Sequence, residues 1–108
     1  MEVALHTQLH AGSVEEYDRL HRTVPDDLFE ALAAAGVRDW RIWRDGAHLF
    51  HVVDVDDYQA MRDALRDHPA NVAWQAVMVP LQAVPDDYSG ADTGLALVWS
   101  FADQGRGG

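Results

Sequence analysis

The 108-residue sequence contains no cysteine, no lysine and no long apolar run. Without cysteine, a disulfide scaffold and a thiolate zinc site are both excluded. All eight basic residues are arginines, against eighteen acidic residues, and the formal net charge is −10. Nucleic acid and anionic membranes are therefore disfavoured as partners, because both require a basic surface. A phosphorylated substrate is disfavoured for the same reason, and a neutral or cationic ligand is favoured.

The sequence also has no segment of the roughly 20 apolar residues that cross a membrane, and its start lacks the pattern of a signal peptide. We therefore expect a cytoplasmic protein. Hydrophobic residues make up 48% of the chain, enough for a core. The length fits one domain, which we place at residues 1–101, followed by a flexible tail at 102–108.

Local patterns predict an alternation of strands and helices. The segment "EVALHTQL" alternates as a strand does, and Ser13 with Glu16 fits a capping box for the next helix. Gly36 fits the end of a second helix, and "DG" fits the turn of a hairpin. The expected elements are strand 2–9, helix 14–21, helix 26–35, strands 37–44 and 48–55, helices 56–69 and 71–81, and strand 95–101.

This order predicts an α+β fold, a ferredoxin-like sandwich in which helices cover one face of an antiparallel sheet. The other face of such a sheet stays open to solvent unless something covers it. A second copy packed sheet against sheet would cover it, so we expect a homodimer.

The segment "EEYDRLH" places Tyr17 and His21 four residues apart, on one face of a helix. Histidine can give and take a proton near neutral pH, and tyrosine offers a hydroxyl. The pair is therefore a candidate for acid–base chemistry, although the same spacing also suits a partly buried aromatic pair. The flat rings of Trp40 and Trp74 suit either a core or the apolar face of a ligand. No spacing of residues predicts a metal site.

Four segments together resemble one known family: "EEYDRLH", "LFEALAAAGVRDWRIWRD", "HLFHVVDVDD" and "WQAVM". In order and gaps, from about residue 3 to 80, they resemble the L-rhamnose mutarotase family. The resemblance implies a dimeric α/β-barrel of ferredoxin-like subunits that needs no cofactor. It also implies a cofactor-free aldose mutarotase that interconverts the α and β anomers of a 6-deoxy-hexose such as L-rhamnose, a neutral monosaccharide. It implies His21 as the proton donor, with sugar contacts from Tyr17, Trp40, Trp74 and Gln75.

The sequence departs from the family pattern at several positions. Leu20 replaces a frequent arginine, and "TVPDD" with Pro25 replaces a stretch that commonly carries a Trp-Pro pair. Trp40 replaces a more usual tyrosine, and Gln75 replaces a tryptophan found in some members. Because His21 is retained, we still expect the same reaction. The changes leave open which sugar is the substrate.

Two alternatives compete with a mutarotase. Small ferredoxin-like dimers include cofactor-free monooxygenases and cyclases that act on aromatic substrates, which is an analogy of fold only. A non-catalytic dimer that binds a small ligand would use Tyr17 and His21 structurally. If the open face of the sheet forms the cavity, His6, Gln8 and His51 can line it, and we assign them no role. The loop 85–94 fits either a lid or a dimer contact.

Overall fold

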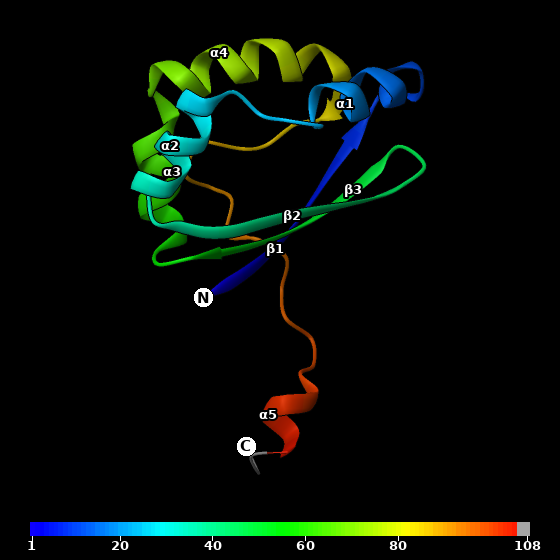
Figure 1. Ribbon diagram of the computed structural model, residues 1–108. Helices are drawn as coiled ribbons and strands as arrows, with labels where there is room; N and C mark the ends of the chain where they lie inside the picture. The colour runs from blue at the N-terminus through cyan, green and yellow to red at the C-terminus, as the bar shows by residue number, and fades with distance from the viewer. Residues whose placement is uncertain (106–108) are drawn as a thin grey trace.

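The computed structural model describes residues 1–105 as a sheet covered on one face by helices (Figure 1). The strands lie in the order β2-β3-β1-β4, and every neighbouring pair is antiparallel. The predicted α+β fold with an antiparallel sheet is therefore confirmed. The elements are β1 Glu2–Leu9, η1 Ala11–Ser13, α1 Val14–Leu20, α2 Asp26–Ala34, β2 Val37–Asp45, β3 His48–Val55, α3 Tyr58–Arg66, α4 Pro69–Met78, η2 Val79–Leu81, β4 Gln82–Val84 and α5 Phe101–Gly105.

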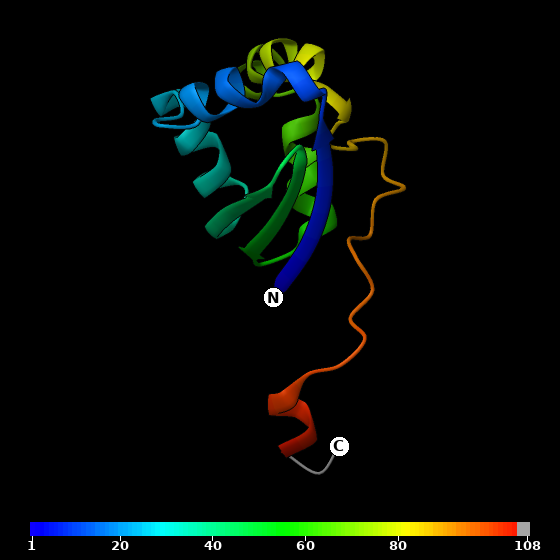
Figure 2. The ribbon, with the colours of Figure 1, turned by 90° about the vertical axis from the view of Figure 1, so that its right-hand side faces the viewer.

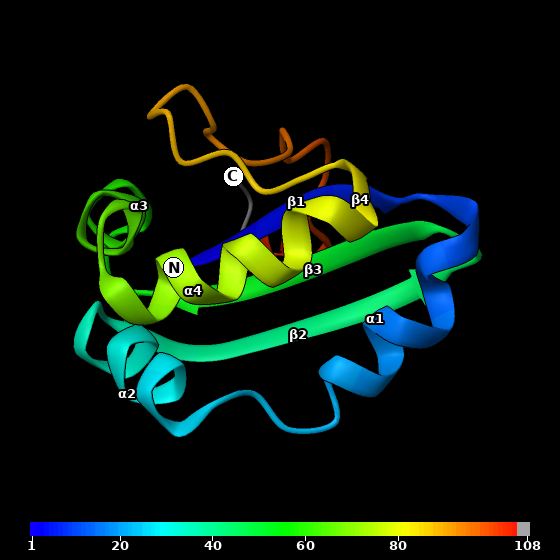
Figure 3. The ribbon, with the colours of Figure 1, turned by 90° about the horizontal axis from the view of Figure 1, so that it is seen from above.

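The alternating residues of β1 and β3 divide between the two faces of the sheet, as the period of two requires. On the covered face both strands bury every second residue, and these side chains form the core with the helices. Seen from above, α4 crosses over the strands, while α1 and α2 lie along the β2 edge and α3 lies beyond the strand ends (Figure 3). The hairpin of β2 and β3 closes at the pair Asp45 and His48, where Gly46 adopts a φ of 57°.

The helix starts and ends are partly as predicted. Helix α1 ends at Leu20, and His21 is its C-terminal cap residue. The predicted capping box is wrong, because Ser13 makes no side-chain cap bond and Glu16 pairs instead with Arg19. Helix α3 is capped by the Asp57 side chain, which accepts a hydrogen bond from the nitrogen of Ala60 at 3.0 Å.

The predicted strand at 95–101 is wrong. The nitrogen of Leu95 donates to the carbonyl of Ala4 at 2.7 Å, but residues 95–100 form no regular element. The chain runs antiparallel to β1 here, and β1 begins only two residues before Ala4, so the segment passes the end of its neighbour. Beyond that point residues 96–105 leave the body as an arm, which is extended over residues 96–100 and visible in Figure 2. A strand needs a second strand beside it to pair its backbone groups, and within the described chain no other strand lies beside residues 96–100.

The arm ends in the short helix α5 (Figure 1). Residues 106–108 of the predicted flexible tail lie outside the described residues, so that mobility stays a prediction. The uncovered face of the sheet carries Trp43 and Phe50, which are cross-strand partners, 52% and 44% exposed. From residue 1 to 105, no helix has the length and apolar character to cross a bilayer.

Candidate active site

A cavity of about 480 Å³ lies between the covered face of the sheet and the helices. That volume is in the range of small-molecule sites. Its wall includes all five residues that the sequence singles out, Tyr17, His21, Trp40, Trp74 and Gln75. The fold therefore brings together segments of α1, β2 and α4 that are far apart in the chain. Their individual roles stay predictions.

Tyr17 and His21 reach the cavity from the last turn of α1. Their rings stack with centroids 4.0 Å apart and planes 28° apart, as the i, i+4 spacing predicts. Trp74 of α4 meets the His21 ring edge-on, at 5.1 Å between centroids. Two aromatic neighbours therefore hold the imidazole in one orientation.

The hydrogen bond of His21 fixes which of its nitrogens carries a proton. Nδ1 lies 3.1 Å from the carbonyl oxygen of Tyr17. Because a carbonyl oxygen only accepts, Nδ1 is the protonated nitrogen, and Nε2 of the neutral ring keeps a lone pair. Burial lowers the pKa of His21, against smaller raising effects of that hydrogen bond, Asp18 and Asp86. The resting imidazole is therefore neutral near pH 7, with Nε2 able to accept a proton.

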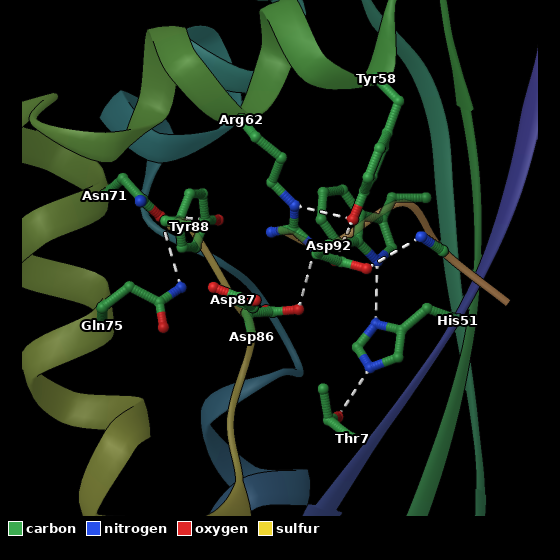
Figure 4. A network of polar contacts seen from close by, with 12 residues as sticks. Thr7, His51, Tyr58, Arg62, Asn71, Gln75, Asp86, Asp87, Tyr88 and Asp92 are labelled. Atoms are coloured by element: carbon green, nitrogen blue, oxygen red, sulfur yellow. Dashed lines mark hydrogen bonds and ion pairs between the residues drawn. The ribbon is translucent and has the colours of Figure 1, made fainter. Parts of the chain in front are cut away.

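A second buried histidine orients Trp40. The indole Nε1 of Trp40 donates to Nδ1 of His51 at 3.0 Å. Since an indole N–H only donates, Nδ1 accepts, and Nε2 of His51 donates to the hydroxyl of Thr7 at 2.9 Å (Figure 4). Both nitrogens of His51 are thus occupied, and burial lowers its pKa. His51 lines the cavity but has no free nitrogen for proton transfer.

Sequence reasoning named the loop 85–94 as a lid or a dimer contact but missed the residues that it contributes to the cavity. Its Asp86 and Tyr88 line the cavity, and Arg62 holds the loop against α3. The guanidinium of Arg62 lies 3.2 Å from Asp86 and 3.4 Å from Asp92, and Figure 4 shows it reaching toward both. Its side chain is 1% exposed. The only signal in the sequence was an arginine on the apolar face of a helix.

Further bonds join the same loop to the helices. Arg66 donates to the carbonyl of Tyr88 at 2.6 Å, and Gln59 donates to the carbonyl of Asp92 at 2.6 Å. The Tyr88 hydroxyl lies 3.4 Å from the amide oxygen of Asn71. In this structure the loop is therefore a fastened wall of the cavity.

The wall of the cavity mixes polar and apolar side chains. Gln75 donates to the amide oxygen of Asn71 at 3.4 Å, beside Tyr88. The wall also includes apolar side chains of α2 and its surroundings, Val24, Leu28, Leu32 and Ile42, and the charged Arg38 and Asp39 of β2. Such a mixture suits a ligand that carries both hydroxyls and an apolar group.

The open face of the sheet does not form this cavity, so the condition under which His6 and Gln8 would line it is not met. The cavity lies on the covered face, and the alternation of β1 turns both side chains away from it. His6 instead lines a smaller hollow beside the loop 85–94. Its Nε2 lies 3.0 Å from Nδ1 of His48. No group of three or more His, Asp or Glu side chains in residues 1–105 is arranged to hold a metal ion.

Comparison with known proteins places the chain in a family. A family model described as L-rhamnose mutarotase matches residues 2–101. An L-rhamnose mutarotase of Burkholderia ambifaria (strain MC40-6) is 34% identical over 101 residues, which cover 92% of this chain and 94% of that protein. One of Paraburkholderia phytofirmans (strain DSM 17436 / LMG 22146 / PsJN) is 32% identical over 89 residues, covering 81% and 82%.

Two solved structures share the fold. The L-rhamnose mutarotase of Formosa agariphila superimposes with a TM-score of 0.73 at 21% identity, over 94% of this chain and 98% of that chain. Tetracenomycin F2 cyclase of Streptomyces glaucescens gives 0.65 at 14% identity, over 93% and 97%. At these identities both likenesses concern the fold alone. The family match over residues 2–101 is independent of them. The chain therefore belongs to the L-rhamnose mutarotase family of carbohydrate isomerases.

Proposed function

We propose that this protein interconverts the α and β anomers of a neutral 6-deoxy-hexose, and that His21 moves the proton. The observation that carries the proposal is the imidazole of His21, with Nδ1 bonded to a carbonyl and Nε2 free, in a cavity large enough for a monosaccharide. The family match and the named relatives support the same reaction.

The proton steps balance with one histidine. Nε2 of neutral His21 takes the proton of the anomeric hydroxyl, and the electron pair left on that oxygen forms the carbonyl of the open aldehyde. The bond between the anomeric carbon and the ring oxygen breaks, and the ring oxygen takes the proton from the imidazolium. Rotation about one C–C bond and the reverse steps close the ring on its other face. A group that both accepts and donates near neutral pH suits this reaction.

The walls of the cavity support a deoxy sugar as the substrate. The rings of Trp40 and Trp74 offer flat faces to C–H groups, and Gln75 offers an amide to hydroxyls. The apolar side chains of Leu28 and Leu32 in the cavity wall suit a sugar that carries a methyl group in place of a hydroxymethyl group. Burial raises the pKa of Tyr17, so its hydroxyl stays protonated and can donate a hydrogen bond to the sugar.

We propose that the working form is a homodimer. Trp43 and Phe50 leave an exposed apolar area on the uncovered face of the sheet. The arm adds Leu97, Val98 and Phe101, which are 78%, 96% and 80% exposed. Exposed apolar groups of this kind mark contact surfaces, and a second copy offers both a matching sheet face and a matching arm.

The two alternatives have less support. The likeness to tetracenomycin F2 cyclase is one of fold alone, so a cyclase or oxygenase acting on an aromatic substrate rests on analogy. A purely structural role for His21 does not explain why Nε2 has no partner among the described residues and lies in a cavity. The predicted cytoplasmic location stays a prediction.

The test is anomer exchange measured by NMR saturation transfer on L-rhamnose and L-fucose. With the wild type, we expect anomer exchange of one of the two sugars to be faster than in buffer alone. His21→Ala should lower the exchange rate constant at least about 100-fold, the usual scale of acid–base catalysis. His10→Ala, at an exposed position outside the cavity, is the matched control and should keep full activity. A folded His21→Ala variant that keeps wild-type exchange would overturn the role of His21. No acceleration of either sugar would reject this substrate class.

A further inference from the structure

The reaction proposed above gives His21 a positive charge in a partly buried aromatic pocket. When Nε2 takes the anomeric proton, the half-buried imidazolium lies against Tyr17 and Trp74. Burial disfavours the charged form, which is why the pKa of His21 is lowered. A reaction that passes through this form needs a compensating negative charge nearby.

The charged and titratable groups around His21 come from three parts of the fold. Tyr17 and Asp18 belong to α1, His51 to β3, and Asp86 to the loop 85–94. Tyr17 and His51 are neutral in the resting protein. The two carboxylates therefore remain as candidates, and both raise the pKa of His21.

Asp18 and Asp86 differ in their surroundings. Each carboxylate pairs with an arginine, Asp18 with Arg44 at 2.9 Å and Asp86 with Arg62 at 3.2 Å, but Asp18 is 49% exposed, so solvent screens its charge further. Asp86 is 14% exposed and lines the cavity together with His21. Less screening makes its charge act more strongly on groups in the same cavity. Asp18 raises the pKa of the resting His21 more than Asp86 does, but Asp18 does not line the cavity, so Asp86 is the carboxylate that shares the cavity with His21.

The position of Asp86 is fixed by a buried cation. Arg62 bonds one carboxylate oxygen of Asp86 through Nη2 and the hydroxyl of Tyr58 through Nε, at 2.8 Å. Its guanidinium carbon lies 4.6 Å from the Tyr88 ring centroid. Among residues 1–105, Arg62 is the one group bonded to the Asp86 carboxylate, and it bonds one of the two oxygens.

We propose that Asp86, held by Arg62, is the counter-charge that stabilises protonated His21 while the sugar ring opens. Asp86 then acts through His21 rather than on the reacting atoms, and its role is one of positioning charge. This inference rests on the proposed function for its kinetic consequence. Its electrostatic content, the effect of one carboxylate on one imidazole, can be tested without any sugar.

The test compares Asp86→Asn with Asp92→Asn. Both variants remove one carboxylate from Arg62, but Asp92 does not line the cavity. We expect Asp86→Asn to lower kcat by about tenfold with little change in KM, and to move the acidic limb of the pH–rate profile about one pH unit lower. Asp92→Asn should stay within about twofold of the wild type in both quantities.

A titration of the His21 ring by NMR gives the second readout. The pKa of His21 should fall in Asp86→Asn and stay unchanged in Asp92→Asn. Unchanged titration in Asp86→Asn, a loss confined to KM, or an equal loss of kcat in both variants would each overturn the proposal. If the wild type accelerates no sugar, the proposed function fails, and the titration still decides whether Asp86 faces His21.

Discussion

The bond between Thr7 and His51 offers a prediction about both stability and the site. Thr7→Val replaces the hydroxyl with a methyl group of nearly the same shape and keeps a β-branched residue in β1. The Nε2–H of His51 then loses its acceptor at 2.9 Å in a place where His51 is 3% exposed. Water has little access to replace the lost bond.

The expected magnitude follows from two opposing effects. A buried donor left without a partner costs about 1–3 kcal/mol of unfolding free energy. The added methyl group returns less than about 0.8 kcal/mol, the value of a fully buried CH₂. We therefore expect a net loss of about 1–2 kcal/mol. Because His51 also holds the Nε1 of Trp40, the KM for the sugar should rise.

The assay is urea unfolding followed by tryptophan fluorescence, at one protein concentration. The control is Thr23→Val, the same chemical change at an exposed position, which should change the free energy of unfolding by less than about 0.5 kcal/mol. Equal values for the two variants would refute the reasoning, since they would show that the hydroxyl of Thr7 satisfies no buried group.

Two other predictions concern pH and assembly. The pKa values of His21 and His51 are lowered by burial, so the unfolded chain binds more protons below about pH 6.5, and the free energy of unfolding should fall between pH 7 and pH 5.5. A flat profile in urea titrations over that window would contradict the burial of neutral rings. The wild type should sediment as a dimer at micromolar concentration, and Phe50→Asp should sediment as a monomer. A monomeric wild type would reject the proposed assembly.

The sequence predicted most elements, because their signals are local. Alternation along β1, the "DG" turn before β3 and the spacing of Tyr17 and His21 depend on nearby residues, and each appears in the structure. The strand expected at 95–101 failed for a non-local reason. Its apolar pattern is strand-like, but β1, the strand beside it, extends only two residues past Ala4 in the direction that the segment runs.

The same distinction applies to the site. The five residues singled out in the sequence all line one cavity. They could be named in advance because the resemblance to a family aligned them with that family's site residues. The bond from Trp40 to His51, and the pairing of Arg62 with Asp86, join residues 11 and 24 positions apart. No periodicity records such pairs, since they depend on how a strand register and a loop place side chains in space.

The loop 85–94 comes late in the chain, so the wall that it forms is the last part of the cavity to be synthesised. Tyr17 and His21 leave the ribosome early, with a helix that forms from local bonds. Asp86 and Tyr88 follow more than sixty residues later, and only then can Arg62 close its contacts. A nascent chain that stops before residue 85 contains Tyr17 and His21 but lacks Asp86 and Tyr88, which complete the wall of the cavity.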